Sequence, residues 1–286
     1  MEEKERPNPF FIYIKIKKEH VYYNYNCNGG KKMPYLFVED FVRLYYEDEG
    51  SGKPLIFVHP PGMGIITFSN QKSLAEHFRI ITYDMRGNGK SSPSNKPVTI
   101  ALLADDLKML LDDLHIDKAV ICGYSNGGSI ALEFALSYPE RIEKLMLIGG
   151  FSEVCTTLLR LEFLLGIYTV KNHGIPLLAK VLGLAHGKHY AEKKAIEQYA
   201  RLTNEGDLYQ MYTEGLRYNC TERLSQLKIP LLLIYGARDY YVHYYQSIFK
   251  KYVPHTDTIY ISKARHQIPT KYHNELNAII KAYCLT

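Results

Sequence analysis

A G-x-S-x-G pattern at residues 123–127 places Ser125 between a strongly apolar segment, residues 119–122, and a helix-like segment that begins near Ser129. Between a buried strand and a helix, this pattern forms a tight turn with the serine at its apex, and small residues beside the serine let strand and helix approach closely. A serine exposed in this way can attack a carbonyl carbon if a neighbouring base takes its proton. The pattern alone also fits a plain glycine turn, but its context predicts that Ser125 is a catalytic nucleophile.

Three further motifs accompany this turn. They are His59-Pro60-Pro61-Gly62 after an apolar strand, a D-x-R-G-x-G-x-S pattern at residues 84–91, and Tyr138-Pro139-Glu140-Arg141-Ile142. On these motifs the chain resembles the α/β-hydrolase superfamily from about Phe37 to its end. The resemblance implies an α/β-hydrolase fold, with a mostly parallel central sheet, helices on both faces and a helical cap insertion. We expect Asp84 and Arg86 to hold a loop rather than to perform chemistry.

The resemblance also implies the chain order serine, acid, histidine for a catalytic triad. Asp239 lies in a G-x-x-D-x-x-V pattern after the apolar segment of residues 230–235, and His266 lies in the loop after the last strand-like segment. A helix N-cap is the alternative role for Asp239. The family usually has glycine before the histidine, whereas this chain has Ala264-Arg265. Ser125, Asp239 and His266 are therefore the predicted catalytic residues.

The oxyanion hole that such chemistry needs is built from backbone N–H donors. In the family pattern the Asn126 N–H supplies one donor, and the residue two positions after the motif histidine supplies the other. Here that residue is Pro61, which has no N–H. We therefore expect Gly62 or Met63 to substitute as the second donor. No cofactor and no metal site are predicted.

Other histidines are assigned less specific roles. His59 is expected to be structural, and His186 with His189 to be solvated, because no third metal ligand is evident near them.

Strand-like and helix-like segments alternate after Met33, which predicts a mostly parallel sheet covered on both faces. The strand-like segments are residues 41–47, 55–58, 80–83, 119–122, 145–148, 231–235 and 258–261. Amphipathic helical segments begin near Ile100 and Ile130. The connection from Gly149 to Leu231 is too long for an ordinary loop and is typical of three or four helices. The expected helices are residues 158–170, 176–184, 192–202 and 208–217.

The predicted organisation has four parts. These are a leader outside the fold, residues 1–32, a first core part, residues 33–150, a helical cap, residues 151–229, and a second core part, residues 230–286. Codons for Gly29 to Met33 could contain a purine-rich bacterial ribosome-binding sequence before an ATG, which makes Met33 a candidate natural start. An ordinary extension is the equal alternative. Part of the apolar content of the cap is expected to line a pocket.

The composition fits a compact globular protein of 286 residues, with 46% hydrophobic and 23% charged residues. A net charge of +5 without a basic stripe argues against nucleic acid as a partner. Five scattered cysteines favour a reducing, cytoplasmic location. No segment is long enough to span a bilayer, so no membrane insertion is expected. A homo-oligomer is left open.

The predicted activity is hydrolysis of a carboxylic ester or lactone, with a small apolar ester-type substrate and an acyl-enzyme on Ser125. A serine at the turn argues against dehalogenase and epoxide-hydrolase chemistry, which uses a carboxylate there. Three alternatives remain open. They are a carbon–carbon bond hydrolase, an aminopeptidase that uses cap acids such as Glu153 or Glu162, and a non-catalytic ligand receptor.

Overall fold

The central element of the fold is an eight-stranded sheet. The computed structural model describes residues 34–285. The strands are β1 (Tyr35–Phe37), β2 (Arg43–Glu49), β3 (Pro54–Val58), β4 (Arg79–Tyr83), β5 (Ala119–Tyr124), β6 (Ile142–Ile148), β7 (Leu231–Gly236) and β8 (Asp257–Ile261). Their spatial order is β1-β2-β4-β3-β5-β6-β7-β8. Strand β2 pairs antiparallel with β1 and β4, and the strands from β4 to β8 pair in parallel. The predicted α/β-hydrolase fold class is confirmed.

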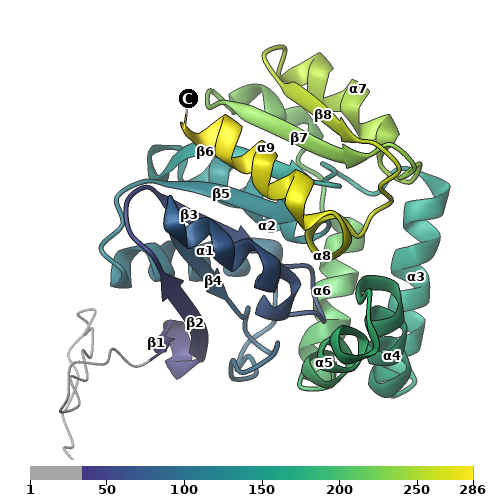
Figure 1. Cartoon of the computed structure of the whole chain (residues 1–286). Helices are drawn as coiled ribbons and strands as arrows, with labels where there is room; N and C mark the ends of the chain where they lie inside the picture. Colours follow the sequence, from purple (N-terminus) through teal and green to yellow (C-terminus); the bar gives the residue numbers. More distant parts are fainter. Residues whose placement is uncertain (1–33, 286) are drawn as a thin grey trace, which may run out of the picture. The chain divides into compact units, whose positions relative to one another are not determined.

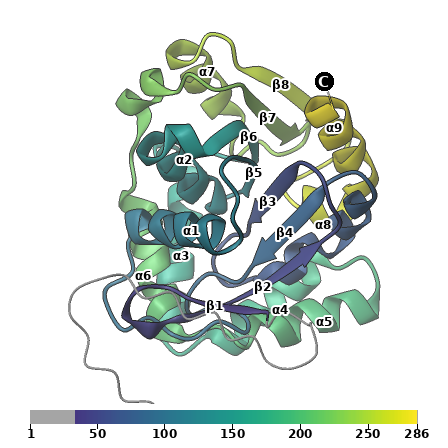
Figure 2. The same cartoon turned by 90° about the vertical axis from the view of Figure 1, so that its left-hand side faces the viewer.

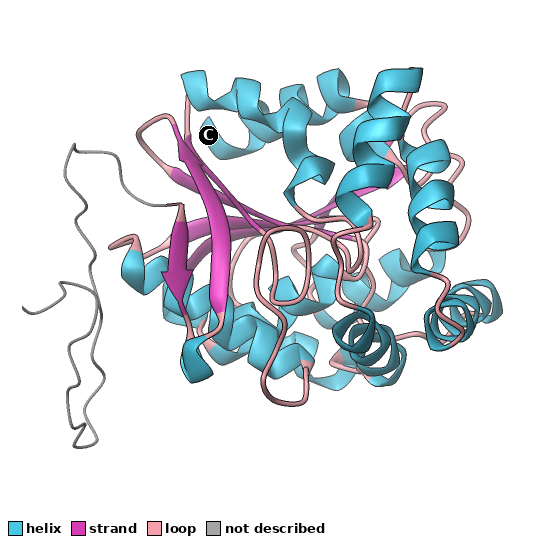
Figure 3. Cartoon of the chain, turned by 90° about the horizontal axis from the view of Figure 1, so that it is seen from below, coloured by secondary structure: helices cyan, strands magenta, loops and turns pink. Residues whose placement is uncertain are grey.

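Helices cover both faces of this sheet, which lies between two helical layers in Figure 3. One face packs against α1 (Ile100–Asp113), α2 (Gly127–Ser137) and α7 (His243–Tyr252). The other packs against the 3-10 helix η2 (Ile65–Glu76), the short α8 (Ile268–Lys271) and α9 (His273–Leu285). Figure 2 shows α1 and α2 on one side of the sheet and α9 on the other.

The apolar runs of the central strands follow from this double covering. Successive side chains of a strand point to opposite faces. In β3, Ile56 and Val58 join the core under α1 and α2, whereas Leu55 and Phe57 join the core under η2 and α9. A strand between two helical layers therefore needs apolar residues at consecutive positions.

The N-terminal edge of the sheet differs from the sequence prediction. Strand β2 begins at Arg43, and Phe41 instead ends a short 3-10 turn, Glu39–Phe41, in which Asp40 and Phe41 both have positive φ. The three-residue β1 was not predicted, because so short a segment offers no periodicity to detect.

Four α-helices, followed by the 3-10 helix η4 (Thr221–Gln226), lie between β6 and β7, where the sequence predicts helical segments. The α-helices are α3 (Thr157–Lys171), α4 (Ile175–His186), α5 (Tyr190–Ala200) and α6 (Glu205–Arg217). Figure 1 shows them gathered at one end of the sheet. We call residues 151–229 the cap segment. None of the helices of residues 34–285 has the length and apolar content to cross a membrane. The predicted leader, residues 1–32, lies outside the described residues.

A buried ion pair fixes the loop after β4. Arg86 donates from Nε to Asp106 Oδ2 at 2.6 Å and from Nη2 to Asp106 Oδ1 at 2.5 Å, and both side chains are almost completely buried. Asp84 in the same loop accepts hydrogen bonds from the Ile65 and Lys90 N–H groups and from the Tyr199 hydroxyl of α5. The loop is thus tied to α1, to η2 and to the cap segment.

The pair predicts a large loss of stability on Asp106→Ala. The variant leaves the Arg86 guanidinium buried without its counter-charge, which should lower the free energy of unfolding by about 3–5 kcal/mol. Urea denaturation followed by circular dichroism measures this change. Arg201→Ala, which breaks an exposed pair with Glu197 on α5, is the matched control and should barely move the unfolding midpoint. Equal midpoints for the two variants would show that the buried pair does not stabilise the fold.

Candidate active site

Ser125 occupies a left-handed backbone conformation, with φ of 52°, in the turn from β5 to α2. Its N–H donates to Ile148 O, and its carbonyl accepts from the Gly128 N–H, both at 2.8 Å. A Cβ at Gly123 would lie 2.7 Å from the Gly128 Cα, and one at Gly127 would collide with the carbonyls of Val58 and His59. The glycines at these positions are therefore required by close packing, while the serine holds a conformation that costs roughly 1–3 kcal/mol.

The structure brings the three predicted catalytic side chains together. His266 Nε2 lies 2.9 Å from Ser125 Oγ, and His266 Nδ1 lies 2.7 Å from Asp239 Oδ2. Ser125 follows β5, Asp239 follows β7, and His266 lies in the loop after β8. These parallel strands end at one edge of the sheet, so residues far apart in the sequence meet there. The Tyr124 hydroxyl donates to His266 O at 3.1 Å and holds the histidine loop against β5.

The electrostatics of this edge favour a charged imidazole. Burial opposes the charged form of His266, but the carboxylates of Asp239 and Glu162 outweigh that effect and raise the pKa of His266 above its ordinary value. Asp239 is itself buried, with 1% of its surface exposed. Its Oδ1 atom has no hydrogen-bond partner among the described residues. The arrangement can take a proton from Ser125 and stabilise the imidazolium that results.

The three predicted oxyanion donors differ in their surroundings. Within residues 34–285 the Asn126 N–H has no hydrogen-bond acceptor. The Gly62 N–H donates to Asn88 Oδ1 at 2.7 Å, and the Met63 N–H donates to Pro60 O at 3.3 Å. Of the three N–H groups, that of Asn126 is therefore the one with no competing acceptor in this structure.

Asn88 has a structural role that the sequence motifs do not predict. Its amide Nδ2 donates to Arg86 O at 3.1 Å and lies 3.4 Å from Met211 Sδ on α6. The side chain is completely buried between the loop after β4 and the cap segment. The only signal in the sequence was its position within the D-x-R-G-x-G-x-S pattern, which gives no information on a bond to Gly62.

His59 is structural, as expected. Its ring is fully buried, Nε2 accepts from the Met85 N–H at 3.1 Å, and Nδ1 lies 2.9 Å from Pro60 O. Burial lowers the pKa of His59. The neutral ring of His59 thus links the loop after β3 to the loop after β4.

The interpretation of His186 as solvated is wrong, whereas His189 is exposed. His186 ends α4, and its ring forms a T-shaped contact with the ring of Tyr124, at a centroid distance of 6.1 Å. Burial, together with the charges of His266 and Lys271, lowers the pKa of His186 to about 3. Its Nδ1 atom has no partner among the described residues. A neutral histidine from the cap segment therefore packs beside the turn that carries Ser125.

Apolar cap side chains also reach the other side of the site. A Cβ placed on Gly62 would lie 3.5 Å from Leu208 Cδ1 of α6 and 3.9 Å from Leu182 Cδ1 of α4. Glu153 lies elsewhere and is engaged, because it accepts from Asn219 Nδ2 and Thr221 Oγ1. The surroundings of the oxyanion loop are thus apolar on the side of the cap segment.

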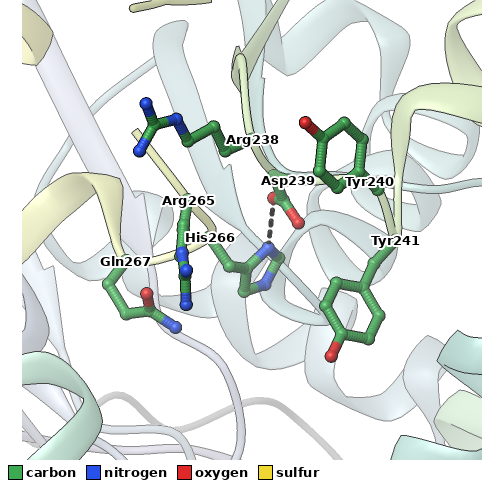
Figure 4. Close-up of a pocket in the computed structure, with 7 residues that line it drawn as sticks. All are labelled: Arg238, Asp239, Tyr240, Tyr241, Arg265, His266 and Gln267. Atoms are coloured by element: carbon green, nitrogen blue, oxygen red, sulfur yellow. Dashed lines mark hydrogen bonds and ion pairs between the residues drawn. The ribbon is translucent and has the colours of Figure 1, made fainter. Parts of the chain in front are cut away.

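A pocket of about 520 Å³ opens beside the imidazole of His266. Figure 4 shows Arg265 and Gln267 on one side of the imidazole and Tyr240 and Tyr241 on the other. The lining residues are Arg238, Asp239, Tyr240, Tyr241, Arg265, His266 and Gln267. In the part of the chain that the structure describes, no group of three or more His, Cys, Asp and Glu side chains is placed to hold a metal ion.

Comparison with known proteins places this fold and site in context. Residues 53–166 match a family described as α/β hydrolase fold. A protein provisionally named a carbamate hydrolase, from Azorhizobium caulinodans, is 25% identical over 261 residues, covering 88% of this chain and 98% of that protein. A 2-hydroxy-6-oxononadienedioate/2-hydroxy-6-oxononatrienedioate hydrolase from Paraburkholderia phymatum is 32% identical over 224 residues, covering 70% of this chain and 76% of the relative.

The solved structures agree on the fold. A carboxylesterase structure from Nitrososphaera gargenis superposes with a TM-score of 0.79 at 21% sequence identity, covering 88% of this chain and 98% of the other. At 21% sequence identity this similarity shows a common fold and carries no information on the substrate.

The raised pKa of His266 predicts that its ring titrates above pH 6.5, the ordinary value for histidine. Glu162→Gln removes one of the two negative charges responsible, so the midpoint should move to lower pH. Titration of the ring nitrogens by NMR measures both midpoints. Glu76→Gln, which changes an exposed acid on η2, is the control and should leave the midpoint in place. A midpoint below 6.5 in the unmodified protein, or one that ignores Glu162→Gln, contradicts the electrostatic account.

Proposed function

The chain belongs to the α/β-hydrolase superfamily, and on that premise we propose that it is a serine hydrolase that cleaves a carboxylic ester or lactone. The observation that carries the proposal is the unbroken line of contacts from Asp239 Oδ2 through His266 to Ser125 Oγ, at 2.7 and 2.9 Å. Family membership supports hydrolysis in general, and this contact line supports a serine nucleophile in particular.

The proposed reaction has two halves. His266 takes the proton of Ser125, whose Oγ attacks the substrate carbonyl, and the resulting oxyanion accepts a hydrogen bond from the Asn126 N–H. His266 then gives the proton to the leaving alcohol, and the C–O bond breaks to leave an acyl-enzyme. Water repeats the sequence with His266 as base and releases the acid. Asp239 orients the imidazole and stabilises its charged form in both halves.

A small, apolar acyl group is the proposed substrate feature on the side of the cap segment. Leu182 and Leu208 of the cap segment pack on Gly62, which belongs to the loop that follows the motif histidine. Apolar walls of this kind favour hydrocarbon groups, and burial of each methylene contributes about 0.8 kcal/mol. The cytoplasmic location and the absence of nucleic-acid partners and membrane insertion remain predictions.

Carbon–carbon bond hydrolysis is the second candidate, because the Paraburkholderia phymatum relative is named for such substrates and shares 32% of the aligned residues. A second relative, from Pseudomonas, is a 2-hydroxymuconate semialdehyde hydrolase, 35% identical over 114 residues. Faster cleavage of 2-hydroxymuconate semialdehyde than of p-nitrophenyl butyrate would favour this candidate over the esterase.

Replacing the nucleophile tests the proposal directly. Ser125→Ala should lower kcat for p-nitrophenyl butyrate by about 10⁶-fold, with His266→Ala similar, because the triad acts as a unit. Asp239→Asn should cost on the order of 10⁴ because the imidazole is held in the wrong tautomer. Ser137→Ala at the end of α2 is the control and should keep wild-type turnover.

Labelling provides the second readout. An organophosphonate should modify Ser125 stoichiometrically, as intact-protein mass spectrometry would show. If the folded protein is not labelled, and Ser125→Ala hydrolyses the ester as fast as the wild type, the chain is a ligand receptor on a hydrolase fold rather than a serine hydrolase.

Because Pro61 has no N–H to donate, we expect the kcat of the unmodified protein to be limited. Pro61 occupies the position whose N–H completes the oxyanion hole in the family pattern, and the neighbouring Gly62 N–H is bonded to Asn88. Pro61→Gly introduces an N–H there and should raise kcat, by up to about 10²-fold, since one donor is worth roughly 10²–10³ in rate. Pro97→Gly, at an exposed proline, controls for added chain flexibility. An unchanged or lower kcat in a Pro61→Gly variant with an unchanged melting temperature would show that the hole is already complete.

A further inference from the structure

Two arginines line the pocket beside His266 without an acidic partner. Arg238 and Arg265 are both exposed, and neither guanidinium forms a hydrogen bond or an ion pair with any described residue. The one carboxylate in the lining, Asp239, is buried and already bonded to His266. The pocket therefore carries positive charge that its own walls do not neutralise.

Lysines extend this positive charge around the same loop. Lys271 lies on α8, and Lys188 and Lys193 come from the cap segment. Burial lowers the pKa of Lys271, and repulsion from Lys193, Arg265 and Lys188 lowers it further. None of the three ammonium groups has a carboxylate within ion-pair distance among residues 34–285. Cations gathered near a cleft raise the local concentration of anions, because low-dielectric walls concentrate the field there.

The position of the pocket indicates which part of a substrate would meet it. In the proposed reaction the protonated imidazole gives its proton to the leaving alcohol, so the alcohol must lie beside His266. The carbonyl of the acyl group must in turn lie within hydrogen-bond reach of the Asn126 N–H, which is the proposed oxyanion donor. His266 and its neighbour Gln267 form part of the pocket wall, so an alcohol that takes its proton from the imidazole would lie next to this pocket.

We propose that this pocket, the arginine pocket, binds a carboxylate or phosphate group carried by the alcohol portion of the substrate. The proposal rests on the proposed function, because it assigns the leaving group to the side of His266. A guanidinium matches the geometry of either anion with two parallel N–H donors. Tyr240, Tyr241 and Gln267 also line the pocket, and each of these side chains carries a hydrogen-bond donor. The substrate class is an ester of a short apolar acid with an anionic alcohol, and water cleaves it to that acid and that alcohol.

Matched esters that differ in one charge test the assignment. The anionic substrate is 3-butyryloxybenzoate, the neutral one is 3-butyryloxybenzamide, and 3-butyryloxyphenyl phosphate distinguishes phosphate from carboxylate. We expect kcat/KM to be at least about tenfold higher for an anionic ester, after correction for the rates of alkaline hydrolysis, because hydrogen bonds to charged groups are the stronger ones. The preference should shrink in concentrated salt.

Variants locate the effect. Arg238→Gln and Arg265→Gln should each lower kcat/KM for the preferred anionic ester by about tenfold and lower kcat/KM for the neutral amide much less, because hydrogen bonds to charged groups are the stronger ones. Arg265→Lys should keep part of the preference, since the charge remains and the paired donors are lost. Arg217→Gln removes an exposed charge from α6 and is the control for net charge. Equal rates for the charged and neutral esters, or a preference that survives both glutamine variants, would overturn the arginine pocket and leave the serine hydrolase intact.

Binding separates this proposal from the failure of catalysis. Isothermal titration calorimetry with 3-hydroxybenzoate, 3-hydroxybenzamide and inorganic phosphate needs no turnover. An anion that binds the wild type and Ser125→Ala, but not the Arg238→Gln/Arg265→Gln double variant, supports the arginine pocket even if no ester is cleaved. Equal affinity for the benzoate and the benzamide, or no binding of any of the three probes, overturns it.

Discussion

The left-handed backbone of Ser125 is the constraint on which the rest of the site depends. A serine with φ of 52° persists because the Ile148 carbonyl and the Gly128 N–H hold the turn from both sides. The turn has no room for larger neighbours, since Gly123 packs on Gly128 and Gly127 packs on the end of β3. The local cost of the conformation is offset by the close packing of α2 against β5, which the same glycines allow.

The parallel sheet then determines where partners for Ser125 can come from. Tyr124 of β5 is in register with Ile148 of β6, which is in register with Ile234 of β7. Two residues further along β7, Gly236 is in register with Ile261 at the end of β8. The loops after β5, β7 and β8 therefore begin close to one another along the strand direction. Two bonds join the last two loops, because the Arg238 N–H donates to Ala264 O and the Ala237 N–H donates to Ile261 O. The loops that carry Asp239 and His266 therefore form one backbone unit. The same unit carries the arginines of the neighbouring pocket.

The sequence predicts those parts of the molecule whose signals are local. Apolar runs predict strands β3 to β8, and helical periodicity predicts helices α3 to α6. The glycines on either side of Ser125 predict its role. The bond between Asn88 and Gly62 joins residues 26 positions apart, and nothing in either local sequence indicates it. The burial of His186 is not predictable from the sequence for a related reason. Its ring is buried and lies against Tyr124, a contact between residues 62 positions apart that neither local sequence indicates.

The oxyanion loop and the cap segment are mechanically coupled through Asn88 and Asp84. Asn88 binds the Gly62 N–H with one end of its amide and contacts Met211 of α6 with the other. Asp84 holds the Ile65 N–H at the start of η2 and the Tyr199 hydroxyl of α5. The Gly62 N–H could serve as a second oxyanion donor only if Asn88 released it. The buried Asn88 oxygen would then have lost its hydrogen bond and would need another donor. A substrate carbonyl would supply no donor to the freed Asn88 oxygen, so the exchange needs a shift of the loop against α6. The number of available oxyanion donors therefore depends on the position of the cap segment relative to the oxyanion loop.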